Sequence, residues 1–282
     1  MGKHSNHFSV TIKPTIPIAN QLAAFATNDI LFDWTEFRIP RGAARLLNIV
    51  ALVRGENGAD QDLRDLEFFF AKRINGIAPP TLGTPNGPVN SALWQNHLIG
   101  MQYMDMDTNN IGSSVDLVYM SMAQMGNRGG GPDLVLSEEG PSGRANIDHD
   151  VFYVACITQG AYDFSTAVET TALYDISALT AATLPGLDDG GGGAALANTK
   201  FAPGDILYDE DGVLIGEVAT IETNAIHFRH DGIKQYHAGG RLLYDTPVDL
   251  RDFKIQTGSG DIAANKEIYN LNPVTIRLSL EQ

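Results

Sequence analysis

The stretch that decides the fold is FDWTEFRIPRGAARLLNIVALVR at residues 32–54, followed by LEFFFAK at residues 66–72. The apolar run after Pro40 predicts a long strand, and RGENG at residues 54–58 predicts the turn that ends it. Three consecutive phenylalanines then put aromatic side chains on both faces of the next strand, so we expect both faces to be covered. Neither stretch contains a nucleophile–base pair, a metal-ligand spacing or a phosphate-binding loop.

Short strands separated by turn signals continue on both sides of this stretch. We expect further strands at residues 8–13, 97–104, 115–122, 133–137 and 150–158. Their spacing predicts an all-β chain whose main domain is a β-sandwich, similar to a jelly roll. Residues 272–280 alternate strictly between apolar and polar, and a lone strand is not stable, so we expect this segment to return to the main domain.

The composition changes near residue 176 and indicates a second part of the chain. DDGGGG at residues 188–193 predicts a flexible linker, and Asp211-Gly212 predicts a hairpin turn within a small β module. We expect a fourth strand of that module at residues 241–244. The expected organisation is a main β-sandwich domain at 1–187 plus 247–282, a Gly-rich linker at 188–198, and an inserted β-barrel or β-meander at 199–246.

Charge and composition exclude several classes of protein. The chain has 282 residues, is 43% hydrophobic and carries a net charge of −15, which argues against a nucleic-acid partner because phosphate binding needs clustered Lys and Arg. No apolar run reaches the roughly 18 residues of a membrane helix, so we expect no membrane partner. The first residues have no apolar segment of the kind a secretory signal needs, so we do not expect them to be one. The single Cys156 cannot form an internal disulfide and is predicted to be a buried core residue.

Candidate chemical groups do not assemble into a recognisable site. DEDG at residues 209–212 fails the spacing of a calcium loop and reads as a hairpin turn. His227 and His230 point to opposite faces of a strand, and His149 has no nucleophile beside it. Glu138 and Glu139 are adjacent and diverge on a strand. We therefore expect no catalytic residue, no metal site and no cofactor.

Two groups of apolar residues are candidates for contact with a partner. The strand at residues 8–13 is either an anchor that reaches a neighbouring subunit or an ordinary strand of its own sandwich. Methionines are dense between residues 101 and 125. They form either an adaptable contact surface or an ordinary part of the core. The candidate contact residues are Phe8, Val10, Ile12, Met101, Met104, Met106, Met120 and Met122.

DWTEFRIPRG at residues 33–42 and FFFAKRINGIAP at residues 68–79 resemble motifs of a family of virion structural proteins of marine tailed bacteriophages. The segment GDILYDEDGVLIGEV at residues 204–218 resembles a unit that such proteins carry. The shared motifs consist of packing and turn residues, so the resemblance implies a role in a particle more than any chemistry.

Together these features predict a capsid decoration or cement protein that binds the head shell between capsomers. The expected partners are the phage major capsid protein and further copies of the chain in a homo-oligomer, whose copy number stays open, with a trimer as one alternative. The expected location is the capsid exterior after synthesis in the host cytoplasm. A receptor- or glycan-binding module of the tail or fibre is the first alternative, and a polysaccharide depolymerase is the second.

Overall fold

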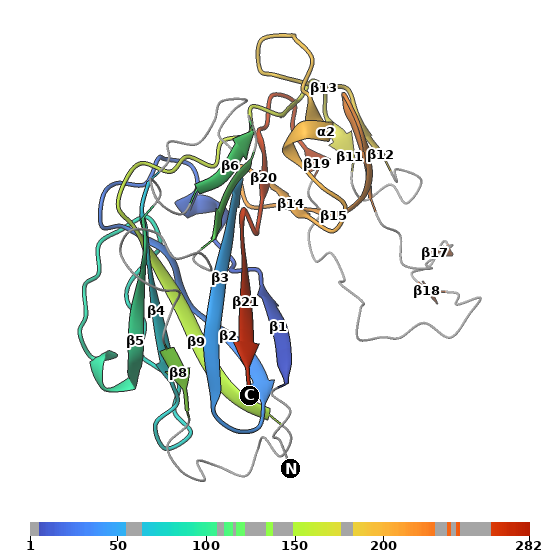
Figure 1. Ribbon diagram of the computed structural model, residues 1–282. Coiled ribbons are helices and arrows are strands. Elements are labelled where there is room, and N and C mark those ends of the chain that lie inside the picture. The colour runs from blue at the N-terminus through green and yellow to red at the C-terminus, as the bar shows by residue number, and fades with distance from the viewer. Residues whose placement is uncertain are drawn as a thin grey trace. The chain divides into compact units, whose positions relative to one another are not determined.

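The computed structural model describes residues 6–54, 64–105, 110–114, 117–121, 134–137, 149–175, 183–228, 236–237, 241–242 and 261–282 (Figure 1). The chain forms two compact units. Unit 1 is Met1–Phe164 with Asn272–Gln282, and unit 2 is Ser165–Leu271. Almost every regular element is a strand in an antiparallel sheet, which confirms the all-β prediction.

Unit 1 is a sandwich of two antiparallel sheets. The first sheet has the order β1-β21-β3-β7-β6. A sixth strand, β8, pairs with the part of β3 that β7 leaves free. The strands of this sheet are β1 (His7–Ile12), β3 (Ala44–Arg54), β6 (Asn110–Ser114), β7 (Leu117–Ser121), β8 (Leu134–Leu136) and β21 (Val274–Glu281). The second sheet has the order β2-β9-β4-β5; its strands are β2 (Ile30–Pro40), β4 (Leu66–Lys72), β5 (Leu98–Met104) and β9 (His149–Thr158). Two short 3-10 helices lie in the connections, η1 (Ile18–Asn20) and η2 (Gln95–His97).

The main core lies between these two sheets. Phe68 and Phe70 of β4 pack into it, whereas Phe69 points to the outer side and is still buried. The expectation that both faces of this strand are covered is therefore confirmed. Cys156 of β9 is wholly buried in the same core, as predicted, and burial raises the pKa of its thiol.

A thin second layer covers the outer side of the second sheet. Trp94 packs its ring edge-on against Phe69, with ring centroids 5.6 Å apart, and against Trp34 at 6.1 Å. The indole N–H of Trp34 donates to the carbonyl of Pro80 at 2.8 Å, which ties the connection between β4 and β5 down onto the sheet.

Strand β21 lies between β1 and β3 in the first sheet (Figure 1). It pairs with β1 from His7–Glu281 to Ile12–Ile276 and with β3 along its other edge. The predicted return of this segment to the main domain is confirmed.

Unit 2 is built around a five-stranded antiparallel sheet of the order β12-β16-β15-β14-β20. Its strands are β12 (Thr183–Pro185), β14 (Ile206–Asp209), β15 (Leu214–Glu222), β16 (Ala225–Phe228) and β20 (Ile268–Asn270). Three two-stranded pairs and one helical turn accompany it: β10 (Glu169–Thr170) with β13 (Leu187–Asp188), β11 (Tyr174–Asp175) with β19 (Asp261–Ile262), β17 (Tyr236–His237) with β18 (Arg241–Leu242), and α2 (Ala197–Lys200). A separate apolar core includes Leu207, Ile226 and Ile268.

Unit 2, at Ser165–Leu271, is larger than the module expected at 199–246 and includes the linker expected at 188–198. Strand β20 pairs with β14, and β12 pairs with β16, so residues on both sides of the expected module belong to its sheet. The expected fourth strand near residue 241 pairs with β17 instead. Residues 188–193 form a tight loop of unit 2, in which the carboxylate of Asp189 accepts hydrogen bonds from the N–H groups of Gly191 and Gly193.

Candidate interaction surfaces

The first candidate surface is the outer edge of β1. Asn6 and Gln282 exchange two backbone hydrogen bonds of 3.1 and 3.0 Å, so Phe8, Val10 and Ile12 also pair with β21 through their backbone groups. Hydrogen bonding alternates along an antiparallel strand, so the N–H and C=O groups of Ser9 and Thr11 point to the other side. Within the described residues these two have no backbone partner there, and both side chains are exposed.

The apolar side chains of β1 face the core of their own unit. Ile12 is buried, and Phe8 and Val10 are half-buried and packed against the same core. Of the two alternatives for this segment, an extended anchor and an ordinary strand of its own sandwich, the structure has the second. The side chains of Phe8, Val10 and Ile12 therefore pack on the core of their own unit, and contact with a neighbour through them stays a prediction.

The second candidate surface is an apolar patch on the outer side of the second sheet, and we call it the outer-face patch. It consists of Leu93, Met101 and Tyr103, whose exposed fractions are 76%, 44% and 48%. Met101 is the cross-strand neighbour of Phe69, and Trp94, the residue after Leu93, lies against the same phenylalanine. The buried ring of Phe69 and the half-buried ring of Trp94 thus support an exposed apolar surface from below.

The methionines predicted as contact residues do not form one surface. Met101 is exposed, but Met104 is wholly buried in the core of unit 1 because β5 turns alternate side chains inward. Met120 lies on β7 in the other sheet, and its side chain is not among those the structure describes. Met106 and Met122 lie outside the described residues. Met104 and Met120 therefore lie in different sheets of unit 1.

Charged side chains also lie on the outer side of the second sheet, on β2 and just after β4. The carboxylate of Glu36 accepts hydrogen bonds from Arg38 and Arg73, each at 3.0 Å. Arg73 also donates to the hydroxyl of Tyr153 at 2.8 Å and lies over its ring, 5.8 Å from the centroid. One carboxylate thus pairs with two guanidinium groups, so this part of the outer side is polar and carries a single excess positive charge.

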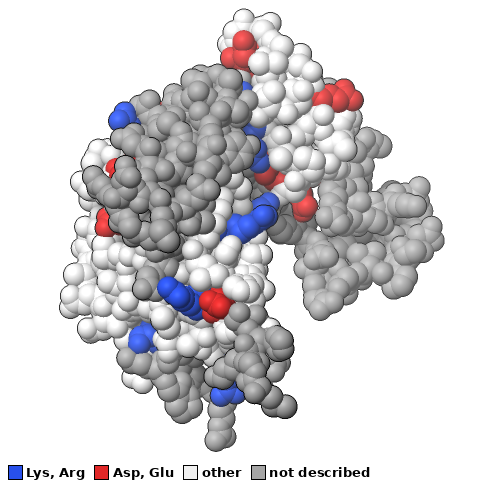
Figure 2. All heavy atoms as spheres, viewed as in Figure 1, with Lys and Arg blue, Asp and Glu red and all other residues white. Residues whose placement is uncertain are grey.

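The described part of the face in Figure 2 shows Lys and Arg side chains interspersed with Asp and Glu. On the first sheet, Arg45 and Arg277 lie on the exposed side together with Glu281. Strand β1 itself carries no Asp or Glu. The acidic excess of the chain is therefore not concentrated along this edge.

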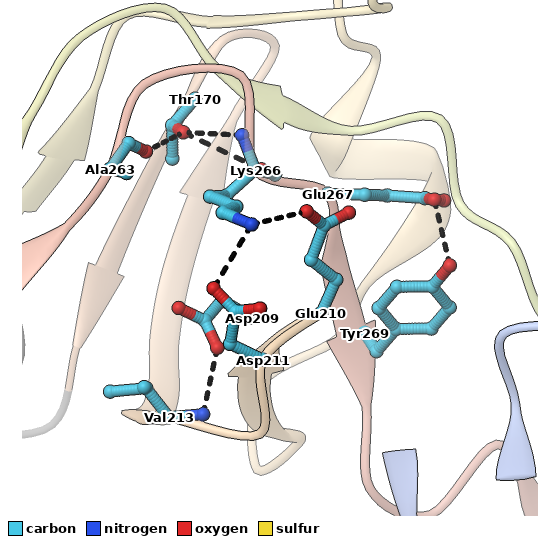
Figure 3. Close-up of polar contacts among 9 residues, drawn as sticks. All are labelled: Thr170, Asp209, Glu210, Asp211, Val213, Ala263, Lys266, Glu267 and Tyr269. Atoms are coloured by element: carbon cyan, nitrogen blue, oxygen red, sulfur yellow. Dashed lines mark hydrogen bonds and ion pairs between the residues drawn. The ribbon is translucent and has the colours of Figure 1, made fainter. Parts of the chain in front are cut away.

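Unit 2 contains a dense polar cluster, shown in Figure 3. The ammonium group of Lys266 contacts Glu210 at 2.6 Å and Asp211 at 3.0 Å, and these hydrogen bonds raise the pKa of Lys266 above its usual range. The Asp209 carboxylate accepts a hydrogen bond from the N–H of Val213 at 2.7 Å, and burial raises its pKa. These contacts confirm the predicted hairpin turn at Asp211-Gly212.

Glu267 is the centre of a second set of contacts in this unit. One carboxylate oxygen accepts hydrogen bonds from the Ser165 hydroxyl and from the N–H groups of Thr166 and Ala167, at 2.7, 2.6 and 3.0 Å. The other oxygen accepts one from the Tyr269 hydroxyl at 2.8 Å. Because both of its oxygens accept hydrogen bonds from other parts of unit 2, this carboxylate has a structural role. The sequence did not point to Lys266 or Glu267, because an adjacent Lys-Glu pair in a polar segment is common on any surface.

The candidate chemical residues are dispersed. His227 lies on β16 beside Glu222 at 3.3 Å, and His149 is the first residue of β9. Glu138, Glu139 and His230 lie outside the described residues. Among the residues that are described, no three His, Cys, Asp or Glu side chains form a group that could hold a metal ion, and no helix is long and apolar enough to cross a membrane.

Comparison with known proteins gave no relative: no family model, curated protein or solved structure matches this chain.

Proposed function

We propose that this chain is a non-enzymatic structural protein of a tailed-phage virion that decorates the head shell and stabilises it between capsomers. The observation that carries the proposal is the outer-face patch, because an exposed apolar cluster on a rigid sheet suits contact with another protein. The resemblance of residues 33–42 and 68–79 to virion structural proteins supports the same role. The partner is the major capsid protein, and the location is the outside of the head.

The binding free energy in this proposal comes mainly from apolar burial. The patch offers Leu93, Met101 and Tyr103, and a net charge of −15 works against an electrostatic hold on an acidic shell. Apolar burial is screened only weakly by salt. Moderately raised salt is therefore expected to leave the protein on the particles.

The test is a binding experiment with shells assembled without this chain. We compare the wild-type protein with the double variant Leu93→Lys/Met101→Lys, which places two charges in the patch. Burial of one apolar side chain contributes roughly 1.5–3 kcal/mol, so the double variant is expected to bind at least about tenfold more weakly. Occupancy is measured by quantitative gel densitometry of the purified particles.

The matched control is Val135→Lys on β8, because Val135 is also an exposed apolar residue, with 53% exposure, but belongs to the other sheet. It is expected to bind like the wild-type protein. Equal loss of binding in both variants, or wild-type binding by the patch variant, contradicts a shell contact through the outer-face patch.

A glycan-binding role in the tail or fibre is the second candidate, and the observation that favours it is the half-buried pair Trp34 and Trp94 on the same side of unit 1. Aromatic rings with polar neighbours such as Arg73 and Glu36 suit a sugar ligand. A glycan array probed with the full chain distinguishes the two functions. Glycan binding that Trp94→Ala abolishes, together with a low copy number in virions, favours the tail or fibre role.

A further inference from the structure

The edge of β1 is unusually open to pairing with another strand. Edge strands of natural sheets are commonly protected by bulges, by Pro, or by charged side chains. Strand β1 pairs with β21 without any register shift, and it contains no Pro, Lys, Asp or Glu. By contrast, the pairings of the edge strands β2, β5 and β6 with their neighbours each contain a register shift.

From this edge we infer that β1 pairs in an antiparallel manner with β1 of a second copy of the chain, so that the first sheet continues across a two-fold axis. Ser9 of each copy exchanges both backbone hydrogen bonds with Thr11 of the other. The two Val10 residues face each other on the axis. This inference does not depend on the proposed role in a virion.

The hydrogen-bonding alternation of β1 restricts the register. The outward backbone groups belong to the odd-numbered residues, so only odd residues pair with odd residues across the new interface. The register with Val10 on the axis pairs Ser9 with Thr11 and places His7 opposite Lys13. The carbonyl oxygen of Lys13 already accepts a hydrogen bond of 3.2 Å from the side chain of Asn272, so the central pairs of Ser9 and Thr11 are the ones that exchange both backbone bonds.

The side chains of β1 complement those of a second β1. On the core side, the axis places Val10 beside Val10 and Phe8 beside Ile12 of the second copy. Phe8 and Val10 are only half-buried in one copy, so pairing covers the remainder of their apolar surface. On the other side lie Ser9 and Thr11, which are uncharged. Since the edge has no Asp or Glu, two chains of charge −15 meet there with little local repulsion.

A two-fold contact of this kind closes after two copies, because each β1 has one outer edge. The inferred assembly is therefore a dimer, which differs from the trimer that the resemblance offers as one alternative. A single strand pair is a small interface, so the dimer is expected to be weak and to dissociate on dilution.

The first test measures the mass of the full chain by sedimentation equilibrium over a range of concentrations. Ser9→Pro removes an outward N–H group, and Pro is tolerated on an edge strand where that group faces solvent. The variant is expected to weaken the dimer at least about tenfold while unit 1 still folds, and Ser9→Ala is the matched control that keeps the N–H group. A monomer at all concentrations, or equal dimerisation of Ser9→Pro, overturns the inference.

The second test fixes the register by cross-linking. In a non-hydrogen-bonded antiparallel pair the Cα atoms are about 4.5 Å apart, which is within the range that a disulfide spans. Val10→Cys is therefore expected to form a disulfide-linked dimer under mild oxidation, whereas Phe8→Cys is not. The native Cys156 is buried and does not compete. Cross-linking of Phe8→Cys or Ser9→Cys in place of Val10→Cys overturns the proposed pairing.

Discussion

Glu267 accepts a hydrogen bond of 2.6 Å from the backbone N–H of Thr166, which lies 101 positions earlier in the chain. Thr166 belongs to the segment by which the chain enters unit 2, and Glu267 belongs to the segment by which it leaves. One carboxylate therefore joins the two ends of unit 2. Hydrogen bonds to charged groups are the stronger ones in proteins, and this carboxylate accepts several.

Loss of this carboxylate is expected to destabilise unit 2. Glu267→Ala removes the acceptor for Ser165, Thr166 and Ala167, and we expect a loss of about 2–4 kcal/mol in the free energy of unfolding, measured by urea titration. Glu222→Ala, at an exposed carboxylate of β15, is the control and is expected to change it by less than about 0.5 kcal/mol. Equal effects of the two variants would show that the junction contributes nothing.

The acidic side chains around Glu169 predict a pH dependence of stability. Burial first, and then the neighbouring carboxylates of Glu267 and Asp188, raise the pKa of Glu169. A raised folded-state pKa stabilises the folded state below the unfolded pKa of about 4.3, and this contribution is lost as the pH rises through the folded pKa. Glu169→Gln is therefore expected to stabilise unit 2 at pH 7.

This difference between Glu169→Gln and the wild-type protein is expected to shrink as the pH is lowered toward 4. Urea midpoints at several pH values measure it. A constant difference across the range would mean that the side chain acts through packing and not through its charge.

The hydroxyl of Tyr162 is expected to contribute to the stability of unit 1. Tyr162 is wholly buried, donates a hydrogen bond of 2.6 Å to the carbonyl of Arg64, and has its pKa raised by burial. Tyr162→Phe is expected to cost about 1 kcal/mol by thermal or urea unfolding. Tyr103→Phe, which removes an exposed hydroxyl that donates to the Asp65 carboxylate, is the comparison, and a larger cost there would contradict the assignment.

From the division of the chain into two units we predict which internal deletion the protein tolerates. Removing residues 189–247 takes β14, β15 and β16 out of the sheet and leaves β12 and β20 without their partners, so we expect aggregation. Removing residues 165–271, with a short Gly/Ser linker between Phe164 and Asn272, takes out unit 2 as a whole. This second deletion is expected to remain soluble and β-rich by circular dichroism, and failure to fold would show that unit 1 depends on unit 2.

The strands of unit 1 could be predicted because their sequence pattern matches their burial. Val274, Ile276 and Leu278 alternate along β21 and all face the core. Alternation does not tell which of two faces is the core side, so Met104 and Met101 could not be separated. The pattern also does not tell which strand pairs with which. Only the structure shows that one edge of β1 is paired with β21 and that its other edge is open among the described residues.

The limits of unit 2 could not be predicted for a related reason. Strands β12 and β20 have three residues each, TLP and IYN, which is too short for a periodic pattern. Their partners lie far away in the sequence, since Leu207 of β14 pairs with Asn270 of β20. The glycines at 190–193 indicate a turn, but the same signal fits a linker and a tight loop.

The position of β21 between β1 and β3 has a consequence for synthesis on the ribosome. Residues 274–281 are translated after all the other strands of unit 1 and after the whole of unit 2. Strands β1 and β3 must therefore wait for the strand that separates them, while residues 165–271 have already emerged and can fold. Pairing over such a long sequence separation is slow, so the first sheet is expected to close last. A nascent chain that carries β1 and β3 without β21 is a natural client for a chaperone.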